Sequence, residues 1–210
     1  MTSRSAGSER PKAEPPQSAP PLTPGARRIL DTAAELFYER GITATGVDTV
    51  AEAAQITKRT LYNRFGSKDA LVTAYLRERD ERWRALVTEA VEERAPGLPR
   101  LLAPFDVLTS WTASNSRGCA FVNALAELPD PAHPAHRVAA EEKKWLRALF
   151  VRLLGESGLK GRERGELADQ LVCLHEGALV LHSLRPGPAA LRPARAGART
   201  LLRAKGIGAG

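Results

Sequence analysis

The segment Ala54–Asp69 constrains the fold of this chain more than any other part of the sequence. It opens with a tight turn, after which the hydroxyl of Thr57 can cap a helix by accepting a hydrogen bond from a backbone N–H. Only Leu61 and Phe65 are apolar in the residues that follow, so this short helix can bury one narrow stripe and leaves the rest polar. Ser67 then opens another helix. The segment therefore predicts a turn, a short polar helix and the capped start of a third helix.

A further short helix is predicted just before this turn. Thr45 followed three residues later by Asp48 resembles a capping box, in which the hydroxyl meets a backbone N–H and the carboxylate lies at the positive helix end. We therefore expect this helix to begin near Gly46, and the two helices together form a helix-turn-helix. Its apolar residues recur at the helical spacing i, i+3, i+4, i+7: Val47, Val50, Ala51 and Ala54.

The second helix of this motif is basic, and no acidic residue lies between Ala53 and Asp69. Ordinary surface helices mix both signs of charge, so a polyanion such as double-stranded DNA is the expected partner. Lys68 begins the following helix, where its ammonium and the helix N–H groups can meet one phosphate. The candidate DNA-contacting residues are Thr45, Thr57, Lys58, Arg59, Thr60, Tyr62, Asn63, Arg64 and Lys68.

Residues 45–69 resemble the DNA-binding segment of the TetR family of bacterial transcriptional regulators. The shared pattern is Thr-x-Val-x-x-[IV]-Ala, a two-residue turn, then Ser/Thr-Lys-x-Thr-Leu-Tyr-x-x-Phe-x-Ser-Lys-[DE]. Weaker similarities at Arg117–Ala124 and Leu174–Ala178 extend the resemblance over most of residues 23–202. The resemblance implies a homodimeric repressor that a small-molecule effector releases from a palindromic operator. No enzymatic activity and no cofactor are expected.

Two residues depart from this family pattern. Gln55 stands where many relatives have Gly, and a side chain at a left-handed turn position costs about 1 to 2 kcal/mol relative to Gly. Arg59 stands where relatives commonly have a small residue, and its guanidinium can reach guanine O6 and N7. Arg59 therefore either reads a base directly or only contacts phosphate.

The rest of the chain predicts an all-α protein, because helical spacing recurs and no segment alternates convincingly as a strand. We expect a disordered arm (1–22), a three-helix DNA-binding domain (23–67), a larger effector-binding and dimerisation bundle (68–204) and a tail (205–210). The first helix starts at Thr23 and stops at Gly41, and a long connecting helix runs from Ser67 towards Arg94. Five more helices are predicted at 98–114, 119–128, 137–154, 165–184 and 189–202.

The penultimate helix is apolar on two sides, which predicts burial on two sides. One side can face the core of its own subunit and the other the same helix of a second subunit, consistent with the dimer that the resemblance implies. The alternative is a helix central to its own bundle. One stripe contains Leu167, Leu171, Leu174, Ala178 and Leu181, and the other contains Val172, Leu179 and Val180.

Candidate effector contacts are large or polar residues of the regulatory helices: Trp111, Phe121, Asn123 and His175. The alternative for each is an ordinary packing role in the core. An apolar or aromatic ligand is the default expectation.

Two other classes of function stay open. A metal-sensing regulator or metalloenzyme would use His133, His136 and His175, yet the first two lie in a Pro-rich loop instead of at a fixed helical spacing. A helical interaction protein would use the basic head against an acidic protein surface. Sequence-specific, salt-dependent DNA binding separates the regulator from that class.

The remaining features indicate a cytoplasmic protein. No stretch approaches the roughly 20 apolar residues that span a membrane, and the N-terminus lacks the apolar core of a signal peptide. Cys119 and Cys173 are too few for a disulfide framework, so we expect buried free thiols, with a redox-sensing pair as the alternative. The net charge of +7 agrees with an anionic partner.

Overall fold

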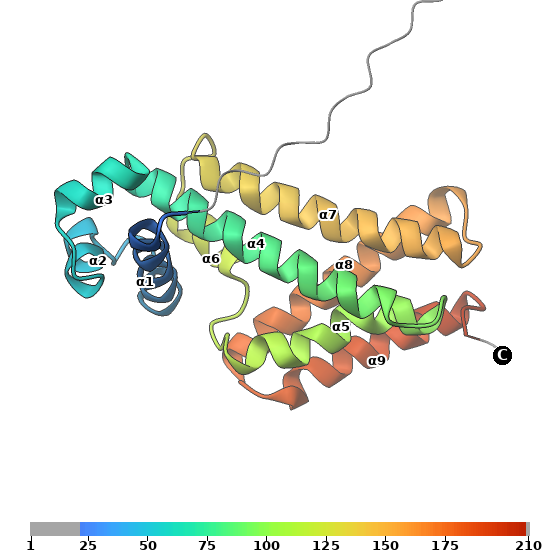
Figure 1. Cartoon of the computed structure of the whole chain (residues 1–210). Coiled ribbons are helices and arrows are strands. Elements are labelled where there is room, and N and C mark those ends of the chain that lie inside the picture. The colour runs from blue at the N-terminus through green and yellow to red at the C-terminus, as the bar shows by residue number, and fades with distance from the viewer. Residues whose placement is uncertain (1–21, 209–210) are drawn as a thin grey trace, which may run out of the picture.

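The computed structural model describes residues 22–208, and the regular structure of these residues is entirely helical (Figure 1). This confirms the predicted all-α class. Residues 1–21, which hold nearly all of the predicted arm, and residues 209–210 lie outside the described part of the chain. The helices are α1 (Pro24–Arg40), α2 (Val47–Ala53), α3 (Lys58–Phe65), α4 (Lys68–Glu92), α5 (Leu98–Ala113), α6 (Ala120–Glu127), α7 (Pro134–Glu156), α8 (Gly161–Leu184) and α9 (Pro188–Ala204).

Helices α1 to α3 form a head at one end of the molecule, and α4 runs from this head along the bundle (Figure 1). The first helix has the predicted ends. Thr23 accepts a hydrogen bond from the N–H of Ala26 (3.4 Å), and Gly41 terminates the helix at φ 97°. A left-handed residue at this place lets the chain leave the helix without a Cβ clash.

The core of the head does not stop at the predicted boundary between residues 67 and 68. Ile29 and Phe37 of α1 pack in the same cluster as Leu71 of α4, Phe121 of α6 and Val138 of α7. The first turns of α4 and the buried side of α6 therefore belong structurally to the head as much as to the bundle.

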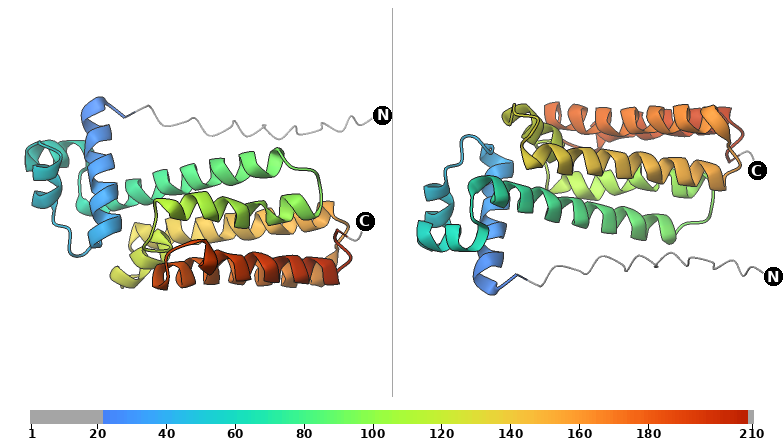
Figure 2. Two further views of the ribbon diagram at one scale, coloured as in Figure 1. Left: turned by 90° about the horizontal axis from the view of Figure 1, so that it is seen from below. Right: turned by 90° about the horizontal axis from the view of Figure 1, so that it is seen from above.

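Helices α4, α5, α7, α8 and α9 lie roughly lengthwise beside one another, with α8 and α9 on the side of the bundle opposite α4 (Figure 2). Their core includes Trp83, Phe105 and Phe150. Pro104 lies inside α5 and does not end the helix. Ile207 is also buried in this core, so the predicted tail packs against the bundle in part. Among the described helices, none has the length and apolar character needed to cross a bilayer.

The later helices extend beyond their predicted starts. Helix α7 begins at Pro134, because a proline fits the first helical position and His133 Nδ1 accepts a hydrogen bond from the N–H of Ala135 (3.1 Å). Helix α8 begins at Gly161, four residues before the predicted start at Gly165. Apolar spacing is absent from the polar first turn of α8, so the sequence pattern placed its start too late.

A polar seam joins the head to α6 and to the loop before it. The Tyr38 hydroxyl of α1 donates to the carbonyl of Gly118 (3.2 Å) and accepts from the N–H of Arg117 (2.9 Å). At the end of α6, Glu127 Oε2 accepts a hydrogen bond from the N–H of Thr43 (2.8 Å). These hydrogen bonds connect the head to α6 and to the loop that precedes it.

Candidate nucleic-acid interface and ligand cavity

The turn before α3 is left-handed, as its sequence suggested. Gln55 has φ 53° and is the one residue other than glycine with positive φ among those described. Thr57 Oγ1 then accepts from the N–H of Thr60 (3.1 Å), and Ser67 Oγ accepts from the N–H of Ala70 (3.0 Å). Both predicted caps are confirmed, so α3 and α4 start where the sequence placed them.

Helix α3 buries one side and exposes the rest. Leu61 is fully buried and Phe65 is half-buried against the head core. Tyr62 keeps 41% of its surface exposed. Figure 1 shows α3 at the outer end of the head, with its C-terminal end leading into α4. The exposed polar residues on it are Lys58, Arg59, Tyr62, Asn63 and Arg64.

The other candidates are less free to reach a ligand. Thr60 is half-buried, and its hydroxyl lies 2.9 Å from the hydroxyl of Thr57. Lys68 is half-buried in the first turn of α4. The hydroxyls of Thr57 and Thr60 are therefore already engaged at the cap of α3. Lys68 forms no ion pair among the described residues, so its ammonium is available at the start of α4.

The structure contradicts the predicted role of Thr45. Helix α2 begins at Val47 with Gly46 as its N-cap residue, and no side chain caps it, so the capping box does not form. Thr45 is instead only 1% exposed, and its hydroxyl donates to the carbonyl of Gly41 (2.7 Å). A buried hydroxyl needs a hydrogen-bond partner, and the carbonyl of Gly41 supplies one. In this conformation Thr45 fixes the loop between α1 and α2 and does not reach the surface.

One contact of this surface was not predicted from the sequence. The carboxylate of Asp48 lies 3.0 Å from Lys58 Nζ, and this contact raises the pKa of Lys58. The pair is ten residues apart in sequence, so the absence of acidic residues between Ala53 and Asp69 did not reveal it. Both side chains are exposed, so water screens the pair and a phosphate can compete for the lysine.

The bundle contains a cavity of about 20 Å³, which is room for about one water molecule. Three predicted effector contacts, Trp111, Phe121 and His175, lie together in its wall. Asn123 does not, because its amide donates to the carbonyl of Arg117 (2.9 Å) in the seam with the head. The lining residues that the sequence did not single out include Arg79, Trp83, Cys119, Glu142 and Lys143.

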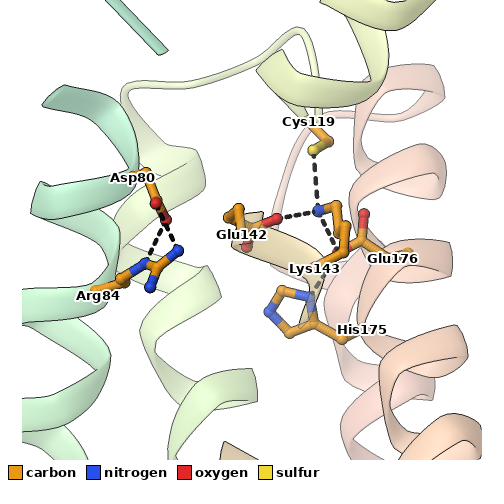
Figure 3. Close-up of polar contacts among 7 residues, drawn as sticks. All are labelled: Asp80, Arg84, Cys119, Glu142, Lys143, His175 and Glu176. Atoms are coloured by element: carbon orange, nitrogen blue, oxygen red, sulfur yellow. Dashed lines mark hydrogen bonds and ion pairs between the residues drawn. The ribbon is translucent and has the colours of Figure 1, made fainter. Parts of the chain in front are cut away.

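Charged side chains form a cluster beside this cavity (Figure 3). Lys143 Nζ of α7 lies 2.7 Å from a carboxylate oxygen of Glu142 and 2.8 Å from one of Glu176, and it donates to Cys119 Sγ at 3.4 Å. Glu176 Oε1 also lies 3.3 Å from His175 Nδ1. One cation thus neutralises two carboxylates that are largely removed from water.

Burial and charge shift these groups in different directions. Burial raises the pKa of Glu142 and of the Cys119 thiol, because each loses hydration of its charged form. Burial also disfavours the charged form of Lys143, but the neighbouring thiol and carboxylates outweigh it and raise its pKa. Burial opposes ionisation of Glu176 too, yet His175 and Lys143 lower its pKa to about 2. We therefore assign Lys143 and Glu176 as charged at neutral pH.

The predicted burial of both cysteines holds only in part. Cys119 is half-buried in the cavity wall, whereas Cys173 is exposed on α8. Both are free thiols.

The described residues do not support the metal-site alternative. His136 Nε2 hydrogen-bonds with the carbonyl of Leu128 (2.6 Å), and His133 caps α7, whereas His175 lies in the cavity wall. Within residues 22–208, no group of three or more His, Cys, Asp and Glu side chains is placed to hold a metal ion.

Helix α8 divides its apolar residues differently from the predicted stripes. Leu179 joins the core, and Leu181 points outward with 46% of its surface exposed. Val180 and Leu184 are exposed by 52% and 71%. An exposed apolar strip therefore remains on the last turns of α8.

Comparison with known proteins places these features in a family. The model described as "Bacterial regulatory proteins, tetR family" matches residues 29–75, from α1 through the helix-turn-helix into α4. The chain is similar over most of its length to SCO4454 from Streptomyces coelicolor, a TetR-family transcriptional regulator of known crystal structure. The two are 35% identical, the match covers 85% of this chain and 95% of SCO4454, and the TM-score is 0.80.

Two further relatives carry functional names. The HTH-type transcriptional activator FasR of Mycolicibacterium smegmatis is 26% identical over 147 residues, which cover 70% of this chain and 67% of FasR. The HTH-type transcriptional repressor KstR2 of Rhodococcus jostii is 39% identical over 71 residues, which cover 32% of this chain and 35% of KstR2.

Proposed function

The chain belongs to the TetR family of DNA-binding transcriptional regulators, and from this we propose that it is a cytoplasmic homodimeric repressor, released from a palindromic operator by a small molecule. Proteins of this family are regulators and not enzymes. The observation that carries the proposal is α3, a capped helix that buries Leu61 and presents its basic and aromatic side chains to solvent at the far end of the head.

The side chains of α3 divide into two roles. Arg59, Tyr62 and Asn63 read or contact the major groove, because each extends from the exposed side of the helix. Lys58, Arg64 and Lys68 contact phosphates, which position the head and make affinity depend on salt. Thr57 and Thr60 support the helix start and offer hydroxyls to the backbone. Thr45 fixes the loop between α1 and α2 through its hydrogen bond to the carbonyl of Gly41.

Dimerisation gives this head a matching partner. The exposed strip of Val180, Leu181 and Leu184 lies on the last turns of α8. This helix packs against α9 on the side of the bundle opposite α4 (Figure 2). A second copy of the same strip would cover it in a two-fold arrangement. Two heads spaced about 34 to 36 Å apart then meet successive major grooves of a palindrome.

For an effector to release the operator, the cavity must be connected to the head, and the seam between the head and α6 makes this connection. Phe121 lines the cavity and belongs to α6, whose residues pack in the head core. A ligand that opens the cavity therefore moves α6 and, through it, the head. A preference of about 1.4 kcal/mol for the state with displaced heads lowers operator affinity tenfold.

Variants of α3 test the DNA-binding roles on an operator selected with the unmodified protein. Arg59→Ala should relax the preference at one base pair by about 1 to 3 kcal/mol, while leaving other positions unchanged. Lys68→Ala should weaken binding to all sequences alike and reduce the slope of log K against log salt by about 1. Arg162→Ala removes the same charge from the exposed start of α8 and should change neither.

The readouts are fluorescence anisotropy with labelled duplexes and sedimentation of the free protein, which should show twice the 22.7 kDa of one chain. Unchanged specificity in Arg59→Ala would limit that residue to phosphate contact. A reporter gene under the operator separates repression from activation, the role named for FasR.

A further inference from the structure

We propose that the cavity binds a small carboxylic acid with an apolar body, and that Arg79 holds its carboxylate. The proposal rests on the proposed function for its regulatory meaning, because it names the chemical class of the effector. Its physical basis is separate: a buried guanidinium whose anion is not supplied by the described part of the chain.

Arg79 lies on α4, is only 6% exposed and lines the cavity. None of the ion pairs among the described residues includes it, and its Nη2 is buried without a hydrogen-bond partner. Its guanidinium instead stacks over two rings, 4.5 Å from the centroid of Tyr38 and 4.9 Å from that of Trp111. A buried charge is costly unless it is paired, so an anion at this place is strongly favoured.

The acidic groups on the cavity side of Arg79 are already paired, and the α1 residues Glu35 and Glu39, which line a surface pocket on its other side, form no ion pair with it among the described residues. Asp80, its neighbour on α4, pairs with Arg84 (2.6 Å), and Figure 3 shows this pair apart from the charge cluster. Glu142 and Glu176 both contact Lys143. With Lys143 shared between the two carboxylates, Arg79 is the cation of the cavity wall that has no carboxylate of its own.

A second polar atom without a partner faces the same space. His175 is 1% exposed and lines the cavity, and its Nε2 is buried without a partner. Nδ1 lies 3.3 Å from the Glu176 carboxylate, which can only accept, so Nδ1 carries the proton and Nε2 of the neutral ring is an acceptor. The Arg79 guanidinium is therefore the group that donates to the two oxygens of a carboxylate, and His175 Nε2 can accept from a hydroxyl of the same ligand.

Aromatic residues complete the site for an apolar body. Trp83 and Trp111 stand with ring centroids 5.4 Å apart, and Phe121 faces the same cavity. The cavity of about 20 Å³ is too small for any organic ligand, so an acid must displace side chains on entry. The Arg79 guanidinium is then drawn from its stack on Tyr38, the residue that ties α1 to Arg117 and Gly118. Binding the carboxylate would thus alter the seam that orients the head.

The test compares matched acids, amides and amines on the full-length protein. The probes are benzoate, phenylacetate and octanoate, the corresponding amides, and benzylamine and phenethylamine. Isothermal titration calorimetry gives affinities, and tryptophan fluorescence reports on Trp83 and Trp111 in the cavity wall. The variant is Arg79→Gln, and its control is Arg82→Gln, an exposed arginine of the same helix.

At least one acid should bind saturably and quench tryptophan fluorescence, with its amide about 30-fold weaker or undetectable. Arg79→Gln should reduce acid affinity by about the same factor, and Arg82→Gln should leave it unchanged. Because Arg79→Gln removes a buried unpaired charge, it should fold with unreduced stability. The comparison of acid with amide on the unmodified protein stands even if that variant does not fold.

Equal affinity for acids and amides would overturn the proposal, since an apolar cavity alone explains it. Tighter binding of the amines would also overturn it and would assign the cavity to a cation held by Glu142 and Glu176. No binding by any acid of the panel would overturn it as well. Operator binding and its release are measured separately, so a failure here leaves the proposed DNA-binding function to be judged on its own data.

Discussion

Removing the Lys143 ammonium tests whether the charge cluster is a buried network. Lys143→Met keeps an unbranched side chain of similar length but leaves Glu142, with 2% of its side chain exposed, and Glu176, with 22%, without their shared cation. Each contact, at 2.7 and 2.8 Å, corresponds to about 6 kcal/mol of Coulomb attraction at an effective dielectric constant of about 20.

The net loss is much smaller than this attraction. Removal of Lys143 also ends the cost of burying its own charge, and a buried carboxyl can take up a proton instead of staying ionised. Breaking a buried pair by removal of one partner typically costs about 3 to 5 kcal/mol, and we expect a value in this range at pH 7.

The pH dependence gives the result a signature. Without Lys143 the folded-state pKa values of Glu142 and Glu176 should lie above their unfolded values, so stability should rise as pH falls from 7 towards 5. The limiting slope is about 1.4 kcal/mol per pH unit for each carboxyl. In the unmodified protein Glu176 has a pKa lowered to about 2, so its contribution is constant over this range.

Urea unfolding followed by far-UV circular dichroism at pH 5 and pH 7 measures both effects, at fixed protein concentration because dimerisation contributes to stability. Lys144→Met removes an exposed lysine from the next position of α7 and should change stability by less than about 0.5 kcal/mol. The triple variant Lys143→Met, Glu142→Gln, Glu176→Gln should recover most of the loss. A loss below about 1 kcal/mol without pH dependence would refute the buried network.

Two further predictions concern the turn and acid stability. Gln55→Gly should stabilise the protein by about 0.5 to 1 kcal/mol, because relief of the strain in the left-handed turn outweighs the greater chain entropy of unfolded glycine. Urea unfolding measures this gain, and the control variant Gln55→Ala should show none. Because its pKa is lowered to about 2, ionised Glu176 should contribute up to about 3 kcal/mol to the free energy of unfolding above pH 4.5, and this contribution should be lost as pH falls towards 2. The difference in stability between the unmodified protein and Glu176→Gln should therefore shrink from pH 5.5 to 3.5. A constant difference would contradict the lowered pKa.

Local signals predicted the DNA-binding head well. Thr23, Thr57 and Ser67 cap helices as expected, and Gly41 ends the first one, because capping depends on neighbours within a few residues. Apolar spacing located the core side of α3 for the same reason. Thr45 failed because its choice between capping a helix and bonding the carbonyl of Gly41 depends on how the loop folds back.

Contacts between different helices could not be predicted from local sequence spacing. The Asp48 contact with Lys58 joins two helices, and the Asn123 side chain turned into the seam instead of the cavity. Arg79 was missed because charged residues are expected on the outer face of a helix, whereas this one shares the inner face of α4 with Trp83. A charged residue four positions from a core tryptophan on one helix was the available signal.

The central claim is that α3 of a dimer reads a palindromic operator. Selection of binding sites from a random duplex library by the full-length protein at physiological salt, followed by sequencing, tests it most directly. We predict a palindromic consensus whose half-sites lie about one helical turn or a multiple of it apart, with binding that falls steeply as salt rises. A folded protein that enriches no sequence, or that binds all duplexes equally, would contradict the claim.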